Sequence, residues 1–332
     1  MRLTCGLAAA ALLVTVAGCS GDSDSDSGSG TSATATASAT VTTAPVVAPY
    51  VDIVSGTADI TAIHTATGQA DFTAAFVLAD SAKTCTPTWG GTAAIDDSTI
   101  AAAIAKITAI SGDVIVSTGG ETGTYLENVC SADELAAAYE KALDVAGSNY
   151  LDVDIEQTVT AATIMTALST VQKARGTAIT LTLPVGGESV GLTDTAIALL
   201  QSAEDAGLDV TVNAMIMNFT GTGSDWGAAL TTATESVKAD VAGVWSDLTD
   251  TEVYAMLGVT PMIGANGLGG PTTVANAKTL LTYAKEKGLG FVRFWSVNRD
   301  NGDCTDGSVS SKCSGISQTD YAFTDLFADY TG

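Results

Sequence analysis

The sequence predicts an α/β protein built as a (β/α)8 TIM barrel, because short apolar runs rich in β-favouring residues alternate with alanine-rich helical stretches. The runs that predict strands are residues 46–53, 72–79, 114–118, 150–156, 178–184, 210–218, 256–263 and 291–297. The helical stretches between them include residues 100–110, 132–145, 161–175, 194–206, 228–244 and 273–287. Eight such units suit a barrel better than an open doubly wound sheet, and no Gly-x-Gly-x-x-Gly follows the first strand. We therefore predict a single domain over residues 46–332, with its functional site at the carboxyl ends of the strands.

Residues 1–45 differ from the predicted barrel in composition. Arg2, an apolar run over residues 7–16 and Ala17-Gly18-Cys19 have the layout of an export signal over residues 1–19, and the run is too short to span a bilayer. Val-Ala-Gly-Cys resembles the lipobox of bacterial lipoproteins, which would make Cys19 the lipidated first residue; a secreted chain with a chance cysteine is the alternative. Residues 20–45, rich in Ser, Thr, Ala, Gly and Asp, predict a flexible tether open to O-glycosylation. We expect the protein at the outer face of the membrane, held by the lipid alone, or secreted.

The charge and histidine counts exclude several classes of function. The chain has 37 acidic and 13 basic residues and a net charge of −24, which argues against binding nucleic acid or an anionic membrane. His64 is the only histidine and lies in a polar stretch that reads as a loop. A multi-histidine zinc site is therefore impossible, and a Ser-His-Asp triad would depend on that one residue. We expect a monomer whose chemistry rests on carboxylates, hydroxyls, amides and aromatic rings, without a metal or cofactor.

The predicted domain contains four cysteines, Cys85, Cys130, Cys304 and Cys313. An even number in an exported chain predicts two disulfides. Cys304 and Cys313 are close enough in sequence to close one loop, which leaves Cys85 with Cys130, although three pairings are formally possible. No Cys-x-x-Cys spacing supports a metal site.

The strand at residues 150–156 ends in alternating acids, Asp152, Asp154 and Glu156. Because side chains alternate along a strand, these three carboxyls share one face, while Val153 and Ile155 share the other. In a barrel the apolar set packs under the helices and the acids line the interior, an expensive arrangement for a purely structural role. An edge strand with its acids in water is the alternative interpretation.

Depth along this strand suggests a role for each acid, since crowded carboxyls share protons and their pKa values rise. Glu156, the outermost, is placed to protonate a departing glycosidic oxygen. Asp154 can hydrogen-bond Glu156 or turn toward a substrate, and Asp152 is expected to share a proton with Asp154. Most glycosidases need a second carboxylate, and no other strand end offers an obvious one. That absence fits substrate assistance, in which the sugar's own 2-acetamido oxygen attacks the anomeric carbon.

The acidic strand resembles the Asp-x-x-Asp-x-Asp-x-Glu signature of glycoside hydrolase family 18, the chitinases and related endo-β-N-acetylglucosaminidases. Ser117-Thr-Gly119-Gly120 resembles that family's Ser-x-Gly-Gly motif, and residues 213–219, including Met215, Met217 and Asn218, resemble its strand-six motif. Trp295 matches the tryptophan that forms the floor of the sugar subsite. Residues 294–300, Cys-Ser-Gly-Ile-Ser-Gln at 313–318 and Cys-Thr-Pro-Thr-Trp-Gly-Gly at 85–91 are similar to a bacterial subgroup of these chitinases. The resemblance runs from about residue 45 to the end of the chain.

This sequence departs from the family pattern at two places. Asn149 replaces the first acid of the signature, at the position farthest from the chemistry. Met217 and Asn218 stand where the family often has a tyrosine and an aspartate beside the acetamido group, so the site brings less charge to tune the catalytic pKa values. Two further aromatic residues are candidates for the site: Trp89, as a sugar platform or a core residue, and Tyr50, at the barrel bottom or in the site.

The resemblance implies hydrolysis of β-1,4-linked N-acetylglucosamine polymers with retention of configuration, on chitin or its oligosaccharides. Catalysis would fall to Glu156, Asp154 and Asp152. Substrate contacts would fall to the residues of the other motifs and the two aromatic candidates: Trp295, Met215, Met217, Asn218, Ser117, Gly119, Gly120, Tyr50 and Trp89. Endo-β-N-acetylglucosaminidase action on glycans is a second hypothesis, and a non-catalytic sugar-binding barrel is a third.

Overall fold

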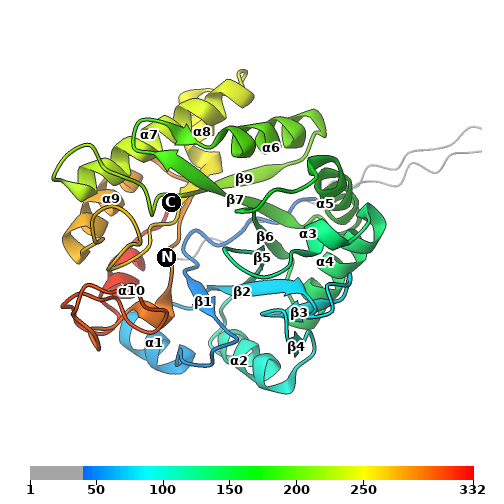
Figure 1. The fold of residues 1–332 in the computed structure, drawn as a ribbon, viewed down its shortest axis with the longest axis horizontal. Coiled ribbons are helices and arrows are strands. Elements are labelled where there is room, and N and C mark those ends of the chain that lie inside the picture. Colours follow the sequence, from blue (N-terminus) through cyan, green and yellow to red (C-terminus); the bar gives the residue numbers. More distant parts are fainter. Residues whose placement is uncertain (1–39) are drawn as a thin grey trace, which may run out of the picture. The chain divides into compact units, whose positions relative to one another are not determined.

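A computed structural model describes residues 40–332 of the chain (Figure 1). The expected export signal, the lipidation site Cys19 and most of the expected tether lie outside the described residues. Thr42, four residues before the boundary predicted near Val46, donates a backbone hydrogen bond to Gly176 O at 2.8 Å. Asn149 also donates to Thr42 Oγ1 at 2.9 Å, so this departure from the signature lies at the amino-terminal end of its strand, away from the acids.

Eight parallel strands form the main sheet, in the order β1-β2-β5-β6-β7-β9-β10-β11. Their bounds are β1 (Tyr50–Asp52), β2 (Phe72–Ala79), β5 (Val114–Gly119), β6 (Tyr150–Asp154), β7 (Ala178–Gly187), β9 (Val210–Met215), β10 (Leu257–Val259) and β11 (Phe291–Val292). The short strands β3 (Pro87–Trp89), β4 (Ala93–Ala94) and β8 (Gly191–Leu192) add antiparallel pairs at the ends of β2 and β7. All eight predicted strands are thus present, and β1, β6, β9, β10 and β11 are shorter than predicted.

The first and last parallel strands also approach each other. Val47 and Val292 form an isolated parallel bridge, and Val292 N donates to Val46 O at 2.9 Å. Farther along, Tyr50 N donates to Phe294 O at 3.1 Å. Backbone hydrogen bonds therefore join the segment of β1, the first strand of the order, to the segment of β11, the last.

Helices lie on the outside of the strands (Figure 1). They are α1 (Ile60–Thr67), α2 (Ser98–Ala109), α3 (Leu126–Val129), α4 (Ala132–Ala146), α5 (Ala161–Arg175), α6 (Asp194–Asp205), α7 (Trp226–Val244), α8 (Asp250–Met256), α9 (Val274–Lys287) and α10 (Ala322–Phe327), with a 3-10 turn η1 (Val297–Arg299). The six predicted helices correspond to α2, α4, α5, α6, α7 and α9. Ser131 and Glu134 form the capping box that their spacing suggests at the start of α4. Among residues 40–332, no helix combines the length and apolarity that a membrane crossing needs.

The loop prediction for His64 is wrong, because this residue lies in α1. Asp59 caps the helix through its side chain, Gly68 ends it in the left-handed conformation, and Ile60 and Ile63 bury one face. The many threonines in this stretch hid the helical spacing of the two isoleucines. His64 Nδ1 lies 3.1 Å from Gln69 O, a contact within the helix end that gives it no part in the site.

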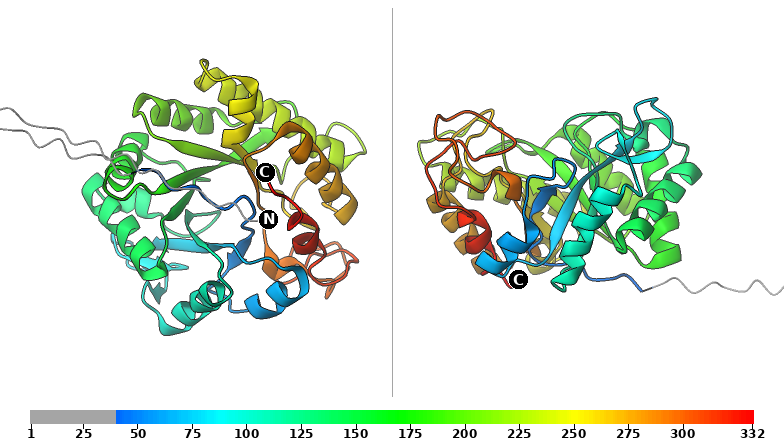
Figure 2. Two further views of the ribbon diagram at one scale, coloured as in Figure 1. Left: turned by 180° about the vertical axis from the view of Figure 1, so that it is seen from behind. Right: turned by 90° about the horizontal axis from the view of Figure 1, so that it is seen from below.

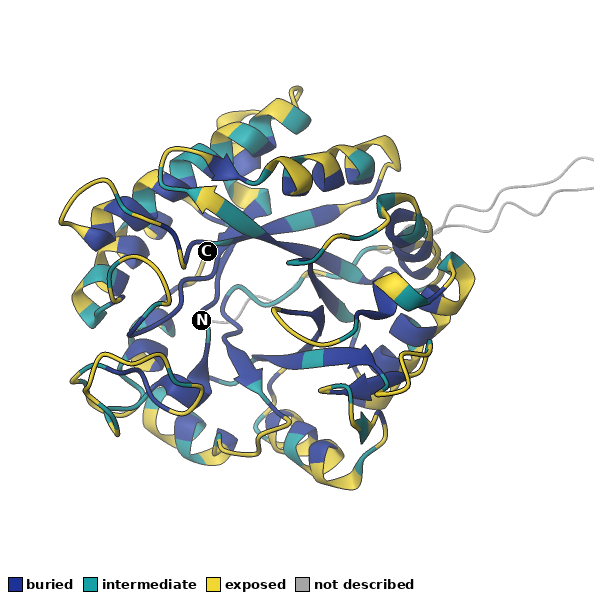
Figure 3. Cartoon of the chain, in the orientation of Figure 1, coloured by how far each residue is buried: buried dark blue, intermediate teal, exposed yellow. Residues whose placement is uncertain are grey.

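The apolar core lies between the strands and the helices. Figure 3 shows the strands largely buried and the outward helix faces exposed. In β6, Leu151 and Val153 are fully buried in the same apolar cluster as Leu143 of α4 and Leu168 of α5. The alternating residues of β6 therefore face the other way, as their period predicts.

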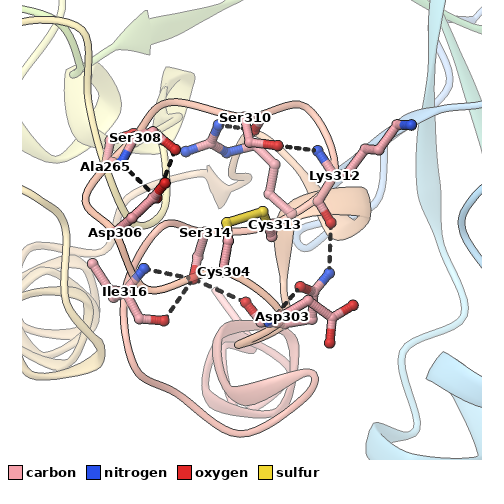
Figure 4. The surroundings of a disulfide bond; sticks show 12 residues. Ala265, Asp303, Cys304, Asp306, Ser308, Ser310, Lys312, Cys313, Ser314 and Ile316 are labelled. Carbon is pink, nitrogen blue, oxygen red and sulfur yellow. Dashed lines mark hydrogen bonds between the residues drawn. A yellow bond between two sulfur atoms is a disulfide. The ribbon is translucent and has the colours of Figure 1, made fainter.

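Both expected disulfides are present. Cys85 pairs with Cys130 at a Cα–Cα distance of 5.0 Å, and Cys304 pairs with Cys313 at 5.9 Å. The second pair closes a loop between η1 and α10 (Figure 4). In the side view of Figure 2 this loop and the loops after β2 rise on one side of the molecule, while the carboxyl terminus lies on the other.

Candidate active site

Asp152 in β6 is the most fully hydrogen-bonded acid of the site. Its Oδ1 accepts hydrogen bonds from Thr182 Oγ1 at 2.6 Å and from Arg293 Nη1 at 2.9 Å. Its Oδ2 accepts from Ser117 Oγ at 2.6 Å and from the Tyr50 hydroxyl at 2.9 Å. All five side chains are buried. Donors from four different strands or strand ends therefore hold one carboxylate in place, and one guanidinium compensates its charge.

Asn213 in β9 orients the hydroxyl groups around this carboxylate. Its Nδ2 donates to the Tyr50 hydroxyl at 3.2 Å and to Thr182 Oγ1 at 3.0 Å, while its Oδ1 accepts from Thr260 Oγ1 at 2.9 Å. Burial, followed by the charge of Asp152, raises the pKa of Tyr50 well above its usual value. The phenol therefore keeps the proton that it donates to Asp152.

Asp154 is placed differently from the expectation that it shares a proton with Asp152. Among the described residues no hydrogen bond joins these two carboxyls, because Asp152 is paired with Arg293, and Asp154 Oδ1 is buried without a hydrogen-bond partner. Burial, then the charges of Glu156 and Asp152, raise the pKa of Asp154 well above its usual value. Burial therefore favours the protonated form of Asp154, which can donate a hydrogen bond toward the pocket.

Glu156 follows β6 and is half-buried at the wall of the pocket. Burial, then the charge of Glu121, raises the pKa of Glu156 to about 7. Its backbone N–H donates to the Tyr125 hydroxyl at 3.0 Å, and that hydroxyl donates to Gly120 O at 2.6 Å. The backbone of Glu156 is therefore fixed by the loop after β5, while its side chain stays accessible.

A pocket of about 230 Å³ lies at the carboxyl ends of the strands. Its lining combines Asp154 of β6 and Glu156 just after this strand with aromatic rings, methionines and small polar groups. The residues are Tyr50, Phe76, Glu121, Asp154, Glu156, Thr182, Met215, Met217, Asn218, Thr260, Met262, Gly267, Trp295 and Val309. A largely apolar pocket with a few convergent polar groups and perturbed carboxyls is typical of a catalytic site.

Three aromatic rings form one face of this pocket. Trp295 stacks on Phe76 with ring centroids 5.5 Å apart and planes 20° apart, and Tyr50 lies 5.8 Å from Trp295. Tyr50 is 1% exposed and bonded to Asp152, whereas Trp295 and Phe76 are partly exposed. The structure thus places Tyr50 in the site rather than at the barrel bottom, and it leaves the Trp295 ring available for a flat apolar ligand face.

Met215, Met217 and Asn218 also line the pocket, as their motif predicts. Asn218 has a φ of 54°, and its Oδ1 accepts a hydrogen bond from Gly267 N at 2.8 Å. Within residues 40–332 its Nδ2 has only the Met262 sulfur as a partner, at 3.9 Å. The amide oxygen of Asn218 is therefore committed to the loop after β10, and its amide nitrogen is left for a ligand acceptor.

Ser117, Gly119 and Gly120 do not line the pocket, which corrects their assignment as substrate contacts. Ser117 is fully buried against Asp152. A Cβ on Gly119 would lie 1.9 Å from Asp154 O, and one on Gly120 would lie 2.8 Å from the Phe76 ring. This motif therefore lets β5 pass close to β6 and positions the acids without touching the ligand site.

Trp89 is a core residue, which corrects its assignment as a sugar platform. It ends β3 and is fully buried, and its Nε1 donates to Ile95 O at 3.1 Å. A ring with no exposed face cannot stack on a substrate.

Comparison with known proteins gives sequence relatives, although no family model matches the chain. Over 312 residues the chain is 30% identical to a probable bifunctional chitinase/lysozyme of Escherichia coli (strain K12), and over 278 residues it is 30% identical to endochitinase 11 of Metarhizium anisopliae. These matches cover 86% and 77% of this chain but only 34% and 52% of the two relatives. The chain therefore spans between about a third and half of the length of these curated relatives.

Comparison with solved structures points the same way. The catalytic domain of a hyperthermophilic chitinase from Pyrococcus furiosus matches with a TM-score of 0.79 and 29% identity, over 90% of this chain and 99% of that domain. Catalytic-site mutants of active domain 2 of the thermostable chitinase from that organism, complexed with chito-oligosaccharides, match with a TM-score of 0.78 and 28% identity over the same shares. By sequence and by fold, this chain is similar to chitinases. The similarity agrees with the resemblance drawn from the acidic strand and the motifs after it.

Several residues of this chitinase-like site were not identified from the sequence. Arg293 lies two residues before Trp295, and this shared strand parity could have placed both side chains on the inner face. Thr182, in the strand next to β6, could have been found by the same reasoning. Glu121 directly follows Gly120, yet no strand end had been expected to supply another carboxylate. The structure brings Glu121 into the pocket from the loop after β5.

Proposed function

We propose that this chain is a chitinase that hydrolyses β-1,4 bonds between N-acetylglucosamine units, with retention of configuration and with Glu156 as general acid and base. The observation that carries the proposal is the Glu156 carboxyl, which shares a pocket with the Trp295 ring and has a pKa raised to about 7. A carboxyl with this pKa is about half protonated near pH 7 and can release its proton to a leaving oxygen. The similarity to chitinases supports the substrate class.

The proposed reaction has two steps and needs no second catalytic carboxylate. In the first, the acetamido oxygen bonds to the anomeric carbon, the glycosidic bond breaks, and Glu156 gives its proton to the leaving oxygen. The products of this step are an oxazolinium ion and the Glu156 carboxylate. In the second, water attacks the anomeric carbon, its proton passes to Glu156, and the acetamido group is restored. Two inversions at one carbon give net retention.

Asp154 and Asn218 are the groups we assign to the acetamido substituent. Asp154 lines the pocket, its Oδ1 lacks a partner among the described residues, and burial raises its pKa and so favours its protonated form. It can donate to Glu156 or turn toward the substrate. The Asn218 Nδ2 group is available for the carbonyl oxygen of a bound sugar. The Asp152–Arg293 pair stays below them and keeps β6 in place.

The proposal extends to the closure of the strands and to the location of the protein. We propose that the eight parallel strands form a closed (β/α)8 barrel, which the hydrogen bonds from Tyr50 N to Phe294 O and from Val292 N to Val46 O support. We also propose that the protein is a monomeric lipoprotein of the bacterial chitinase subgroup. It would be exported and held at the outer face of the cell membrane through Cys19, or else secreted. The residue pattern at positions 1–19 supports this location.

The test of the proposed function is turnover of chitotetraose by the full chain, with the products followed by NMR. We expect cleavage, with the new reducing ends released first as the β-anomer. Release of the α-anomer would contradict the retaining mechanism. Binding without turnover would favour a non-catalytic sugar-binding protein, and cleavage confined to N-glycans would favour an endo-β-N-acetylglucosaminidase.

Glu121→Gln is expected to move the basic limb of the pH–rate profile to lower pH. The negative charge of Glu121 contributes to the raised pKa of Glu156, and a general acid works only while it is protonated. Removing that charge lowers the pKa of Glu156, so kcat/KM on chitotetraose falls at a lower pH than in the unaltered protein. The measurement is kcat/KM against pH between about 4 and 9, with Glu204→Gln on the exposed face of α6 as the matched control.

The same variant separates two mechanisms. Substrate assistance predicts that Glu121→Gln keeps most of its activity at the pH optimum. Near-complete loss at every pH would mean that Glu121 is the second catalytic carboxylate and would overturn the role given to the acetamido group.

A further inference from the structure

The loop between η1 and α10 contributes one residue, Val309, to the lining of the pocket. Val309 is 51% exposed, among the most exposed of the large apolar side chains in the described residues. An exposed valine is ordinary on a surface, but this one lies at a pocket whose other lining includes Trp295. Val309 can contact a bound ligand only if the loop holds its side chain at the pocket.

One disulfide and several hydrogen bonds hold this loop in place (Figure 4). The Cys304–Cys313 disulfide closes it with a separation of nine residues, so Val309 lies near the tip of a short ring. Gly307 N, within this ring, donates to Gly315 O just beyond Cys313 at 3.0 Å. A closed loop of this length has little freedom to move its tip away from the pocket.

Arg299 joins this loop to a neighbouring part of the pocket wall. Its side chain is 1% exposed, and its Nη1 donates to the carbonyl of Ser310, the residue after Val309. Its Nη2 donates to Ile263 O and Ala265 O, both at 2.8 Å. The segment around these two carbonyls also supplies Met262 and Gly267 to the pocket. One buried guanidinium therefore sets the spacing between two stretches of the pocket wall.

A second contact keeps the same two stretches together. Ala265 N donates to Ser314 O at 2.7 Å. Gly264 has a φ of +72°, and a Cβ there would lie 2.0 Å from Ser314 O, so the backbones meet too closely for any side chain. The loop is thus seated on the segment after β10 rather than standing free in solvent.

We propose that the Cys304–Cys313 loop is a preformed wall of the sugar site and that Val309 contacts the apolar surface of a bound N-acetylglucosamine unit. This inference rests on the proposed function and adds a specificity residue and a positioning device to it. A pyranose presents C–H groups and an acetamido methyl group, and a half-exposed valine loses water-accessible apolar area when either one covers it. The disulfide and Arg299 act by holding Val309 in place, so that substrate binding does not have to order the loop.

The test measures chitotetraose binding by calorimetry on the full chain carrying Glu156→Gln, so that turnover does not interfere. Val309→Ser in that background is expected to weaken binding roughly three- to tenfold. Val190→Ser, at an exposed valine outside the pocket, is the matched control and is expected to leave the affinity unchanged. In the active protein, Val309→Ser is expected to raise KM with little change in kcat, because the contact forms in both the bound and transition states.

The positioning role is tested by a double-mutant cycle between Val309→Ser and the pair Cys304→Ser with Cys313→Ser. Loss of the disulfide is expected to weaken binding several-fold, and the two losses are expected not to add, since both remove the same contact. Fully additive losses, or a disulfide variant that is less stable to heat but unaltered in affinity, would overturn the positioning role.

The outcomes also separate this inference from the proposed function. If the Glu156→Gln protein binds chitotetraose and Val309→Ser matches Val190→Ser, the inference is wrong and the proposed function stands. If the Glu156→Gln protein with Val309 intact binds no chitotetraose, both are overturned.

Discussion

Glu156→Gln is expected to lower kcat on chitotetraose by roughly 10²–10⁴-fold while leaving the fold and substrate binding intact. Glutamine keeps the size and hydrogen-bonding surface of glutamate but carries no proton that it can release to a leaving oxygen. Glu156 is half-buried, and its backbone position is set by the Tyr125 hydroxyl, so the substitution does not disturb the wall of the pocket. The measurement is steady-state turnover, with circular dichroism to check the fold and calorimetry to check binding.

The matched control is Glu204→Gln, the same chemical change on α6 away from the pocket, which is expected to leave kcat unchanged. Turnover by Glu156→Gln at the rate of this control would contradict the assignment of Glu156 as general acid and base. In the unaltered protein kcat/KM should fall as pH rises through the Glu156 pKa of about 7, because the acid form is the active one. Residual turnover in Glu156→Gln should lack that basic limb.

The part of this site that lies on one strand could be predicted from the sequence. The alternation of Asp152, Asp154 and Glu156 with apolar residues fixes one face by strand geometry alone, and the structure places Asp154 and Glu156 in the pocket. The two disulfides could be predicted for a similar reason, since the closeness of Cys304 and Cys313 in sequence left one partner for Cys85.

Contacts that depend on irregular backbone could not be predicted in this way. Phe76 stacks on Trp295, but the pairing of β2 with β5 shifts register between Ala74 and Val77, so period-2 counting fails at this residue. For Trp89 the sequence leaves a sugar platform and a core residue both open, and the short β3–β4 hairpin buries it. For both Phe76 and Trp89, local irregularity of the backbone determines the contacts of the side chain, and the order of strands and helices does not.

The partner of Asp152 shows why charges within a core are hard to read from sequence. Three acids on one face suggested shared protons, because β6 itself carries no cation. The compensating guanidinium comes from beyond β11, 141 residues away along the chain. Pairing at that distance is a property of the tertiary structure, and it changes the expected chemistry from a shared proton to an ion pair with four hydrogen-bond donors.

Arg293→Met is expected to destabilise the domain by about 3–5 kcal/mol, because it leaves Asp152 buried without its counter-ion. Arg293 is 1% exposed and Asp152 is fully buried, so neither water nor salt can replace the lost partner. The measurement is urea unfolding followed by tryptophan fluorescence. Arg175→Met is the matched control, because Arg175 pairs with Asp144 at the surface, where the Asp144 side chain is 67% exposed. Its expected cost is about 1 kcal/mol or less.

The Arg293 side chain has contacts besides the one with Asp152. Arg293 also donates to Thr180 Oγ1, and its guanidinium lies 4.6 Å from the Phe291 ring centroid, so methionine replaces the packing but not the charge. An uncompensated Asp152 carboxylate raises the pKa of Asp154 further, because the Asp152 charge already contributes to that shift. Adding Asp152→Asn to Arg293→Met removes the orphaned charge and is expected to restore a large part of the lost stability. Equal losses in Arg293→Met and Arg175→Met, or no recovery in the double variant, would show that the buried pair does not have the role given to it here, and Asp152 would then be held by its three hydroxyl donors alone.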